Sequence, residues 1–326
     1  MLSFLNFRLY DSRVIQKFVR DSAKKLLGKL FPGSLVLNSS EFRYILGINT
    51  ILANRSGHKE LKILSDAEVS VFSQWGEDGI LDFLLQRLQI SKPKILEIGA
   101  GDFSECNSRF AIQYRNCSAY LVDAREDLKE NLEKSFSMWK GTVSAECIFV
   151  TPENINEIFE RARSFMGGIE VLSIDIDGID YWVAQRLDWA DINIAIVEYN
   201  PLFGHRNTVS VPLETFTSRF EQHYSGLYFG ASIRSWIELM ESNNLVFVGS
   251  NRIGNNAFFV NKKLCLESSI PIPDTNDLSG FVDWRIRDSR NRDGSLTYLN
   301  LTEMQSVLSG MPVVDTRTMT KIPLSF

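Results

Sequence analysis

The chain has 326 residues, of which 44% are hydrophobic, and a formal net charge of −5. This length and composition suffice for one large domain with additions. The negative charge disfavours a dedicated nucleic-acid-binding protein, because neutralising phosphates requires a basic face.

The cysteines and the hydrophobic pattern indicate the cellular compartment of the protein. Four cysteines are present, and none forms a CxxC pair. A zinc site or disulfide framework is therefore not expected, and this usage fits a reducing cytosol. The sequence shows neither a run of about 18 apolar residues nor a signal-peptide pattern, and we expect a cytoplasmic protein.

Residues 1–66 are predicted to be an N-terminal helical extension. Seven basic and two acidic residues precede Phe31, and apolar residues recur among them at roughly helical spacing. A basic amphipathic helix over residues 1–30 could contact an anionic surface at the inner membrane face. The same pattern suits a helix that packs on the main domain or on a second copy in a homo-oligomer.

Residues 67–264 alternate between buried-strand and helical patterns. This alternation predicts a doubly wound, mostly parallel, Rossmann-like α/β sheet. Helices are expected over 80–88, 155–164 and 232–242. Strands are expected over 94–100, 119–123, 147–150, 171–176 and 192–199, followed by a hairpin over 245–249 and 257–260 that closes the sheet with a terminal antiparallel strand. Residues 265–326 are polar and contain Pro271, Pro273 and Pro312, which predicts an irregular C-terminal tail packed on the domain.

The first two predicted strands end in a nucleotide-binding pattern. In open parallel sheets, ligands bind beyond the carboxyl ends of the strands, where the strand order reverses. The first strand carries ExGxG, with Glu97, Gly99 and Gly101, and glycines there let the backbone approach a ligand. The second strand ends in Asp123, 22 positions after Gly101, where a carboxylate can accept both ribose hydroxyls of an adenosine.

Three details favour S-adenosylmethionine (SAM) over NAD at this site. Ser104 stands where a dinucleotide fingerprint has its third glycine. Glu97 lies within the strand signature, as is typical of methyltransferases. The hairpin after residue 244 matches the methyltransferase version of the sheet. NAD enzymes share the general geometry, so a NAD-dependent sugar oxidoreductase or epimerase stays an alternative, although the α/β region has no YxxxK pair.

Several motifs carry a family resemblance over residues 70–315. The chain resembles a bacterial group of SAM-dependent methyltransferases akin to the FkbM-type enzymes, which O-methylate sugars and polyketides. The resemblance implies a class I fold, SAM as methyl donor and a sugar, glycan or lipid-linked glycan as acceptor, within polysaccharide biosynthesis. It also implies that Gln74 meets the methionine end of SAM and that Asn154 approaches the adenine. The motifs are SQWGEDG, LEIGAGD, LVDA, LSIDIDGIDYW, VEYNPLFG, YFGAS and NAFFV, with RDSRNRDGSLTYL and GMPVVD in the tail.

Polar residues at the next two strand ends predict the site of chemistry. Asp175 and Asp177 are two apart, as are Glu198 and Asn200, and residues two apart in a strand share a face. Asp175, Glu198 and Asn200 therefore form a candidate Mg²⁺ or Ca²⁺ site, with Asp175 and Asp177 as catalytic residues. Some sugar and catechol O-methyltransferases hold a metal at these strand ends, where it lowers the pKa of the acceptor hydroxyl.

Alternatives to this metal site remain open. Asp177 could cap the following helix, and Asp175 and Glu198 could hold the substrate or SAM without a metal. His205, in the loop after the fifth strand, is a candidate general base. A non-catalytic SAM-binding module is a further alternative, although four polar residues at two strand ends argue against a decayed site.

Overall fold

The computed structural model describes residues 39–54, 61–215 and 218–326. The chain divides into two units, Met1–Leu46 and Gly47–Phe326. The helix α2 (Ser39–Asn54) is the first described element. The predicted amphipathic helix over residues 1–30 lies outside the described residues and stays a prediction. None of the described helices combines the length and apolar character that crossing a bilayer requires.

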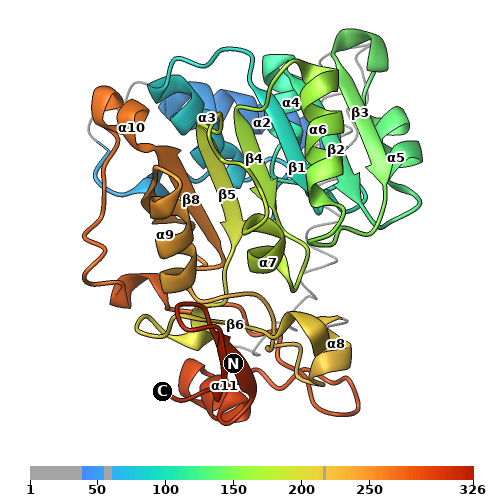
Figure 1. The fold of residues 1–326 in the computed structure, drawn as a ribbon. Coiled ribbons are helices and arrows are strands. Elements are labelled where there is room, and N and C mark those ends of the chain that lie inside the picture. The colour runs from blue at the N-terminus through green and yellow to red at the C-terminus, as the bar shows by residue number, and fades with distance from the viewer. Residues whose placement is uncertain (1–38, 55–60, 216–217) are drawn as a thin grey trace, which may run out of the picture. The chain divides into compact units, whose positions relative to one another are not determined.

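A seven-stranded sheet forms the centre of the second unit, in the order β3-β2-β1-β4-β5-β8-β7 (Figure 1). The strands from β1 to β5 are mutually parallel, whereas β8 runs antiparallel to both β5 and β7. This confirms the predicted doubly wound sheet and its closing hairpin, with the antiparallel strand one position inside the edge. The strands are β1 (Lys94–Ile98), β2 (Ser118–Asp123), β3 (Val143–Cys147), β4 (Val171–Ile174), β5 (Ile194–Glu198), β7 (Leu245–Ser250) and β8 (Asn256–Asn261).

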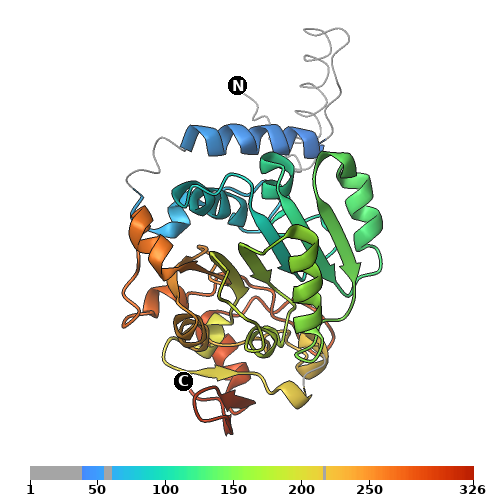
Figure 2. The same ribbon diagram turned by 45° about the horizontal axis from the view of Figure 1, so that its top comes forward.

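Helices cover both faces of this sheet. One buried cluster joins one face to α6, α7 and α9, and a second joins the other face to α3, α4, α5 and α10. Figure 2 shows the teal helix α3 and the yellow-green helix α6 on opposite sides of the strands. Coverage on both faces explains why β1, β4 and β5 are almost continuously buried. The helices are α3 (Glu77–Arg87), α4 (Arg109–Arg115), α5 (Leu128–Ser135), α6 (Ile155–Met166), α7 (Asp180–Ala184), α9 (Ile233–Ser242) and α10 (Lys262–Ser268).

The third strand lies four residues earlier than predicted, over Val143–Cys147 instead of 147–150. This strand is at the edge of the sheet, and its alternating burial lets polar Ser144 and Glu146 occupy the half-exposed face. The prediction followed the apolar run Ile148–Phe149–Val150, which instead forms a loop that lines a cavity.

The C-terminal tail is more regular than its sequence indicates. It contains α11 (Leu301–Leu308), which begins with a capping box between Asn300 and Glu303. The strand β9 (Pro312–Asp315) pairs with β10 (Thr320–Pro323) on one side and with the short strand β6 (Val209–Ser210) on the other, in a second, antiparallel sheet. A four-residue strand such as β9, which pairs with Val209 and Ser210 more than 100 residues earlier, leaves little pattern in the local sequence. The short helices of this unit are α8 (Arg219–Gln222) and the 3₁₀ turns η2 (Leu64–Ala67), η3 (Met138–Lys140), η4 (Pro201–Phe203), η5 (Leu213–Thr215) and η6 (Ser279–Phe281).

Candidate active site

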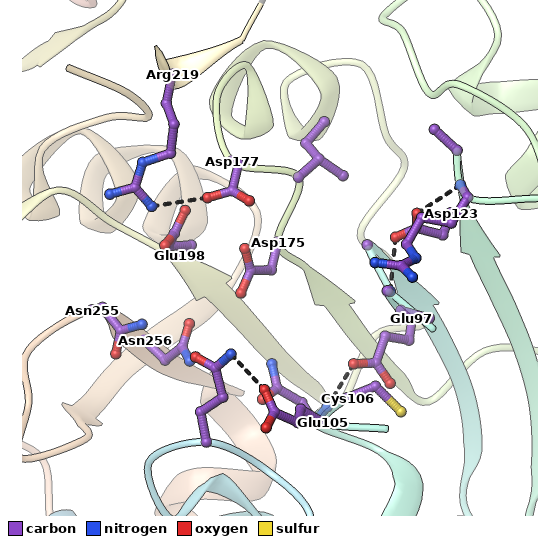
Figure 3. A pocket seen from close by; sticks show the side chains of 18 of the residues that line it. Glu97, Glu105, Cys106, Asp123, Asp175, Asp177, Glu198, Arg219, Asn255 and Asn256 are labelled. Atoms are coloured by element: carbon purple, nitrogen blue, oxygen red, sulfur yellow. Dashed lines mark hydrogen bonds and ion pairs between the residues drawn. The ribbon is translucent and has the colours of Figure 1, made fainter. Parts of the chain in front are cut away.

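A cavity of about 1110 Å³ lies at the carboxyl ends of β1, β2, β4 and β5. The strand order reverses between β1 and β4, which is the place where open α/β sheets bind ligands. Figure 3 shows that side chains from these strand ends and from the β8 side face this space. The predicted site residues that line it are Gln74, Glu97, Gly99, Gly101, Asp123, Asp175, Asp177 and Glu198.

The two positions after β1 that hold glycine, Gly99 and Gly101, do so for different structural reasons. Gly99 has φ +88°, and a Cβ there would lie 1.5 Å from the backbone oxygen of Asp175. Glycine at this position thus lets β1 and the end of β4 approach each other. Gly101 has φ +58°, and its Cβ would meet no described heavy atom within 4 Å. A side chain at Gly101 would instead project into the space beside the cavity wall.

Asp123 joins the ends of β1 and β2. Its Oδ2 accepts a hydrogen bond of 2.7 Å from the Gly101 N–H, and its Oδ1 accepts one of 2.9 Å from the Arg125 N–H. Ile148 N–H donates to the Asp123 carbonyl at 2.8 Å, so the cavity-lining Ile148 and Phe149 lie beside this carboxylate. A carboxylate next to an apolar surface is a combination that fits the ribose and base of a nucleoside.

Glu97 shapes the loop around the cavity as well as lining it. Its buried carboxylate accepts hydrogen bonds from the backbone N–H groups of Asn107 at 2.7 Å and Ser108 at 3.0 Å, and from the Ser108 hydroxyl. Burial raises the pKa of Glu97, although these donors act in the opposite direction. Glu97 therefore anchors the segment that leads into α4, a role that its position in the ExGxG motif did not indicate.

The loop that carries Gln74 is held by α3. Gln74 Nε2 donates to Glu105 Oε2 at 2.9 Å across the mouth of the cavity. Behind it, Asp78 Oδ2 accepts hydrogen bonds of 2.7–2.9 Å from three consecutive backbone N–H groups, those of Val71, Phe72 and Ser73. Asp78 thus fixes the path of the chain immediately before Gln74.

We expect Asp78 to make stability depend on pH. Burial raises its pKa from 3.8 to about 7, in spite of its three N–H donors. Between about pH 4 and pH 7 the unfolded chain has lost this proton and the folded chain retains it, so the free energy of unfolding should fall as pH rises. Asp78→Asn should flatten the decline, as measured by urea unfolding across this range. The exposed Asp188→Asn is the control, and an unchanged slope in Asp78→Asn would contradict the assignment.

Three carboxylates meet where β4 and β5 end. One oxygen each of Asp175, Asp177 and Glu198 lies within 4.8 Å of the others, and Figure 3 shows the three side chains facing one another. Glu198 is 6% exposed, and its Oε2 has no hydrogen-bond partner among the described residues. Burial and the neighbouring acidic groups raise the pKa of Asp175 and of Glu198 well above their usual range.

Arg219 of α8 is the cation that contacts this carboxylate cluster among the described residues. Its Nη1 donates to Asp177 Oδ1 at 3.0 Å, and its Nε donates to the Gly226 carbonyl at 2.7 Å. The guanidinium lies 4.1 Å from the centre of the Phe229 ring and 3.5 Å from Asp288 of the tail. With the three carboxylates ionised, the cluster and Arg219 carry a formal charge of −2, which favours a proton or a further cation.

The predicted Asn200 does not reach the carboxylate cluster. Its Nδ2 donates to the carbonyls of Leu227 and Phe229 at 2.9 and 3.0 Å, and its Oδ1 accepts from the Leu202 N–H at 3.0 Å. These bonds cap η4 and use both ends of the amide. The prediction of a shared face failed because β5 ends at Glu198, so the alternation of a strand does not extend to Asn200.

His205 and Asn154 also lie outside the described lining of the cavity. His205 follows η4, which turns the chain away from the strand end, and its Nε2 accepts from the neighbouring Arg206. Asn154 Oδ1 accepts from the Thr151 N–H, and its Nδ2 donates to the Phe149 carbonyl, both at 2.8 Å. Asn154 therefore shapes the loop that presents Phe149.

Asp177 does not cap α7, because the N-cap position of this helix is occupied by Ile179.

Several cavity residues escaped the sequence analysis. Arg219 lies in a four-residue helix without a recognisable motif. Asn255 and Asn256 stand in the turn and strand of the closing hairpin, where asparagines usually indicate only a turn. The motif NAFFV did contain Asn256, but nothing in its pattern showed that the residue faces β5. Trp284, Ile286 and Asp288 of the tail also line the cavity.

The fold defines a Rossmann-like α/β protein with a cavity at the carboxyl ends of its parallel strands and a cluster of three carboxylates within that cavity. No family model and no curated protein matches the sequence. A putative hemolysin from Lactococcus lactis is similar in structure, with 13% identity and a TM-score of 0.36 over 62% of this chain and 92% of that one.

Two further solved structures show the same level of similarity. PKMT2 from Rickettsia typhi, in complex with AdoHcy, has 13% identity and a TM-score of 0.35 over 58% of this chain and 51% of that one. An O-methyltransferase family protein from Burkholderia thailandensis has 9% identity and a TM-score of 0.33 over 68% and 70%. This chain spans 59% of a geranyl diphosphate methyltransferase and 58% of a coclaurine N-methyltransferase. Similarities this weak leave the function to be argued from the site.

Proposed function

We propose that the protein is a SAM-dependent O-methyltransferase that acts on a hydroxyl of a sugar or glycan, including a lipid-linked glycan of polysaccharide biosynthesis. The cofactor assignment rests on the hydrogen bond from the Gly101 N–H to the Asp123 carboxylate at the ends of β1 and β2. The acceptor class rests on the motif resemblance to FkbM-type enzymes.

The residues around Asp123 fit SAM in kind. The carboxylate can accept the two ribose hydroxyls, and Ile148 and Phe149 offer the adenine an apolar surface. A Cβ at Gly101 would project beside this surface without touching described protein atoms, so glycine there leaves room for the cofactor. SAM, when bound, supplies a methyl group on a sulfonium that is an excellent leaving group.

The carboxylate cluster is the proposed acceptor end of the cavity. Methyl transfer to an alcohol requires alignment of the hydroxyl and removal of its proton. Burial raises the pKa of Asp175 and of Glu198, so the ionised form of either group is a stronger base toward such a proton than an ordinary carboxylate. Asp175, Asp177 and Glu198 also offer the hard oxygen donors that Mg²⁺ prefers, and Mg²⁺ held there would supply Lewis-acid polarisation of the hydroxyl.

The alternatives explain fewer of these observations. A dinucleotide enzyme would be expected to have a third glycine where Ser104 stands. A SAM-binding module without activity would have no use for a buried Glu198 oxygen that lacks a partner in the described chain. Such a group lowers stability unless a ligand satisfies it.

Binding of SAM tests the cofactor assignment. Asp123→Ala removes the acceptor for both ribose hydroxyls, and we expect SAM affinity to fall by about 1–3 kcal/mol. Isothermal titration calorimetry with SAM, S-adenosylhomocysteine and NAD measures this directly. The control is Asp127→Asn, an exposed aspartate that pairs with Arg125. Binding of NAD without binding of SAM would refute the proposal.

A further inference from the structure

Asn256 lies directly beside the carboxylate cluster. It is the antiparallel partner of Glu198 in the pairing of β5 with β8, and directly paired residues place their side chains on the same face of a sheet. The residue is 3% exposed and lines the cavity. Figure 3 shows Asn256 next to Glu198, with its side chain facing the carboxylates.

A hydrogen bond fixes the orientation of the Asn256 amide. Its Nδ2 donates to Glu77 Oε1 at 2.9 Å, and Asn251 Nδ2 donates to the same oxygen at 2.7 Å. The other Glu77 oxygen, Oε2, accepts from the Trp75 N–H at 3.0 Å. An ionised carboxylate only accepts hydrogen bonds, so the NH₂ group of Asn256 must face Glu77 and its Oδ1 must face the other way.

The Asn256 Oδ1 that results is buried and has no donor among the described residues. Glu198 Oε2, across the strand pair, is in the same condition. Leaving such oxygens without a partner lowers the stability of the folded protein. A ligand that satisfies both must be electron-poor, and the formal charge of −2 around Arg219 favours a divalent cation over a neutral hydroxyl.

We propose that Asn256 Oδ1 is a fourth oxygen ligand of the divalent cation held by Asp175, Asp177 and Glu198, and that Glu77 is the positioning residue for its amide. Asn256 thus takes the place that the sequence assigned to Asn200. The inference rests on the cation site within the proposed function. Carboxylate and amide oxygens together form a donor set that suits Mg²⁺ or Mn²⁺.

Binding of Mn²⁺ to the full-length protein tests this ligand set. The protein is stripped with EDTA and dialysed, Mn²⁺ binding is followed by electron paramagnetic resonance of the free ion, and Mg²⁺ is added as competitor. Asn256→Ala should weaken Mn²⁺ binding about 10- to 100-fold. Asn255→Ala is the matched control, because Asn255 lines the same cavity but its Oδ1 already accepts from Asn251 Nδ2 at 2.7 Å.

Glu77→Gln tests the positioning role. Glutamine at this position can donate as well as accept, so the Asn256 amide is free to turn. We expect weaker Mn²⁺ binding at a nearly unchanged SAM affinity, with a lower unfolding midpoint because one buried N–H donor loses its acceptor. If Glu77→Gln binds Mn²⁺ as tightly as the unsubstituted protein, the positioning role of Glu77 is wrong. If Asn256→Ala does so, Asn256 is not a ligand of the cation.

A measurement on the unsubstituted protein covers the case in which Asn256→Ala does not fold. Labelling the asparagine side-chain carbonyls with ¹³C should produce a strong ¹³C coupling in electron–nuclear double resonance of bound Mn²⁺, and its absence would overturn the inference. Failure of the unsubstituted protein to bind Mn²⁺ would remove both the cation site and this inference. SAM affinity, measured on the same samples, decides separately whether the cofactor proposal stands.

Discussion

Gly99→Ala is expected to destabilise the fold severely. The new Cβ would lie 1.5 Å from the Asp175 backbone oxygen, and no rotation of a side chain can relieve a contact with backbone. The φ of +88° adds strain for any residue with a Cβ. The left-handed conformation costs about 1–2 kcal/mol and overpacking about 1–3 kcal/mol. Together they are a large fraction of the stability of a typical domain, and urea unfolding measures the loss.

Gly101→Ala is the matched comparison for this prediction. The residue shares the positive φ but faces no described heavy atom within 4 Å of a Cβ, so only about 1–2 kcal/mol of stability should be lost. SAM affinity should nevertheless fall at least about tenfold, because the methyl group would project into the proposed cofactor space. Equal stability of Gly99→Ala and Gly101→Ala would contradict the inference that β1 and the end of β4 approach each other closely at Gly99.

Glu198→Ala is expected to reduce the rate of methyl transfer severely and to leave SAM affinity nearly intact. The substitution removes a buried carboxylate from the cluster with Asp175 and Asp177, on the far side of β1 from Asp123. Losing a preorganised charged group at the reacting centre typically costs about 10²–10³ in rate. Transfer of a labelled methyl group from SAM to a panel of sugars and glycans gives the rate, and calorimetry gives the SAM affinity.

The same assay separates a cation-assisted route from proton removal by the protein alone. EDTA should inhibit and Mg²⁺ should restore activity if the cluster binds a cation. Asp102→Asn is the charge control, since Asp102 lines the cavity but lies outside the cluster. Full activity in EDTA would rule out the cation, and full activity of Glu198→Ala would rule out this place for the acceptor.

The local sequence determined the sheet core and the residues at the ends of β1 and β2 that line the cavity. Buried strands have continuous apolar runs, so β1, β4 and β5 were predictable, as was the hairpin of β7 and β8. Gly99, Gly101 and Asp123 were recognised because each sits at a strand end whose position follows from the strand itself. The start of the edge strand β3 was predicted four residues too late, because partial exposure weakens the apolar signal that marks a strand.

Only the tertiary structure decided which groups meet at the acidic end. Asn200 and His205 are close to Glu198 in sequence, yet the chain leaves the sheet after Glu198 and turns into η4. Asn256 is 58 residues from Glu198 and is brought opposite it by the antiparallel pairing of β5 with β8, while Arg219 arrives from a helix of four residues. Periodicity within one strand predicts which side chains share a face, whereas contacts between distant segments depend on strand pairing and loop paths that no local pattern records.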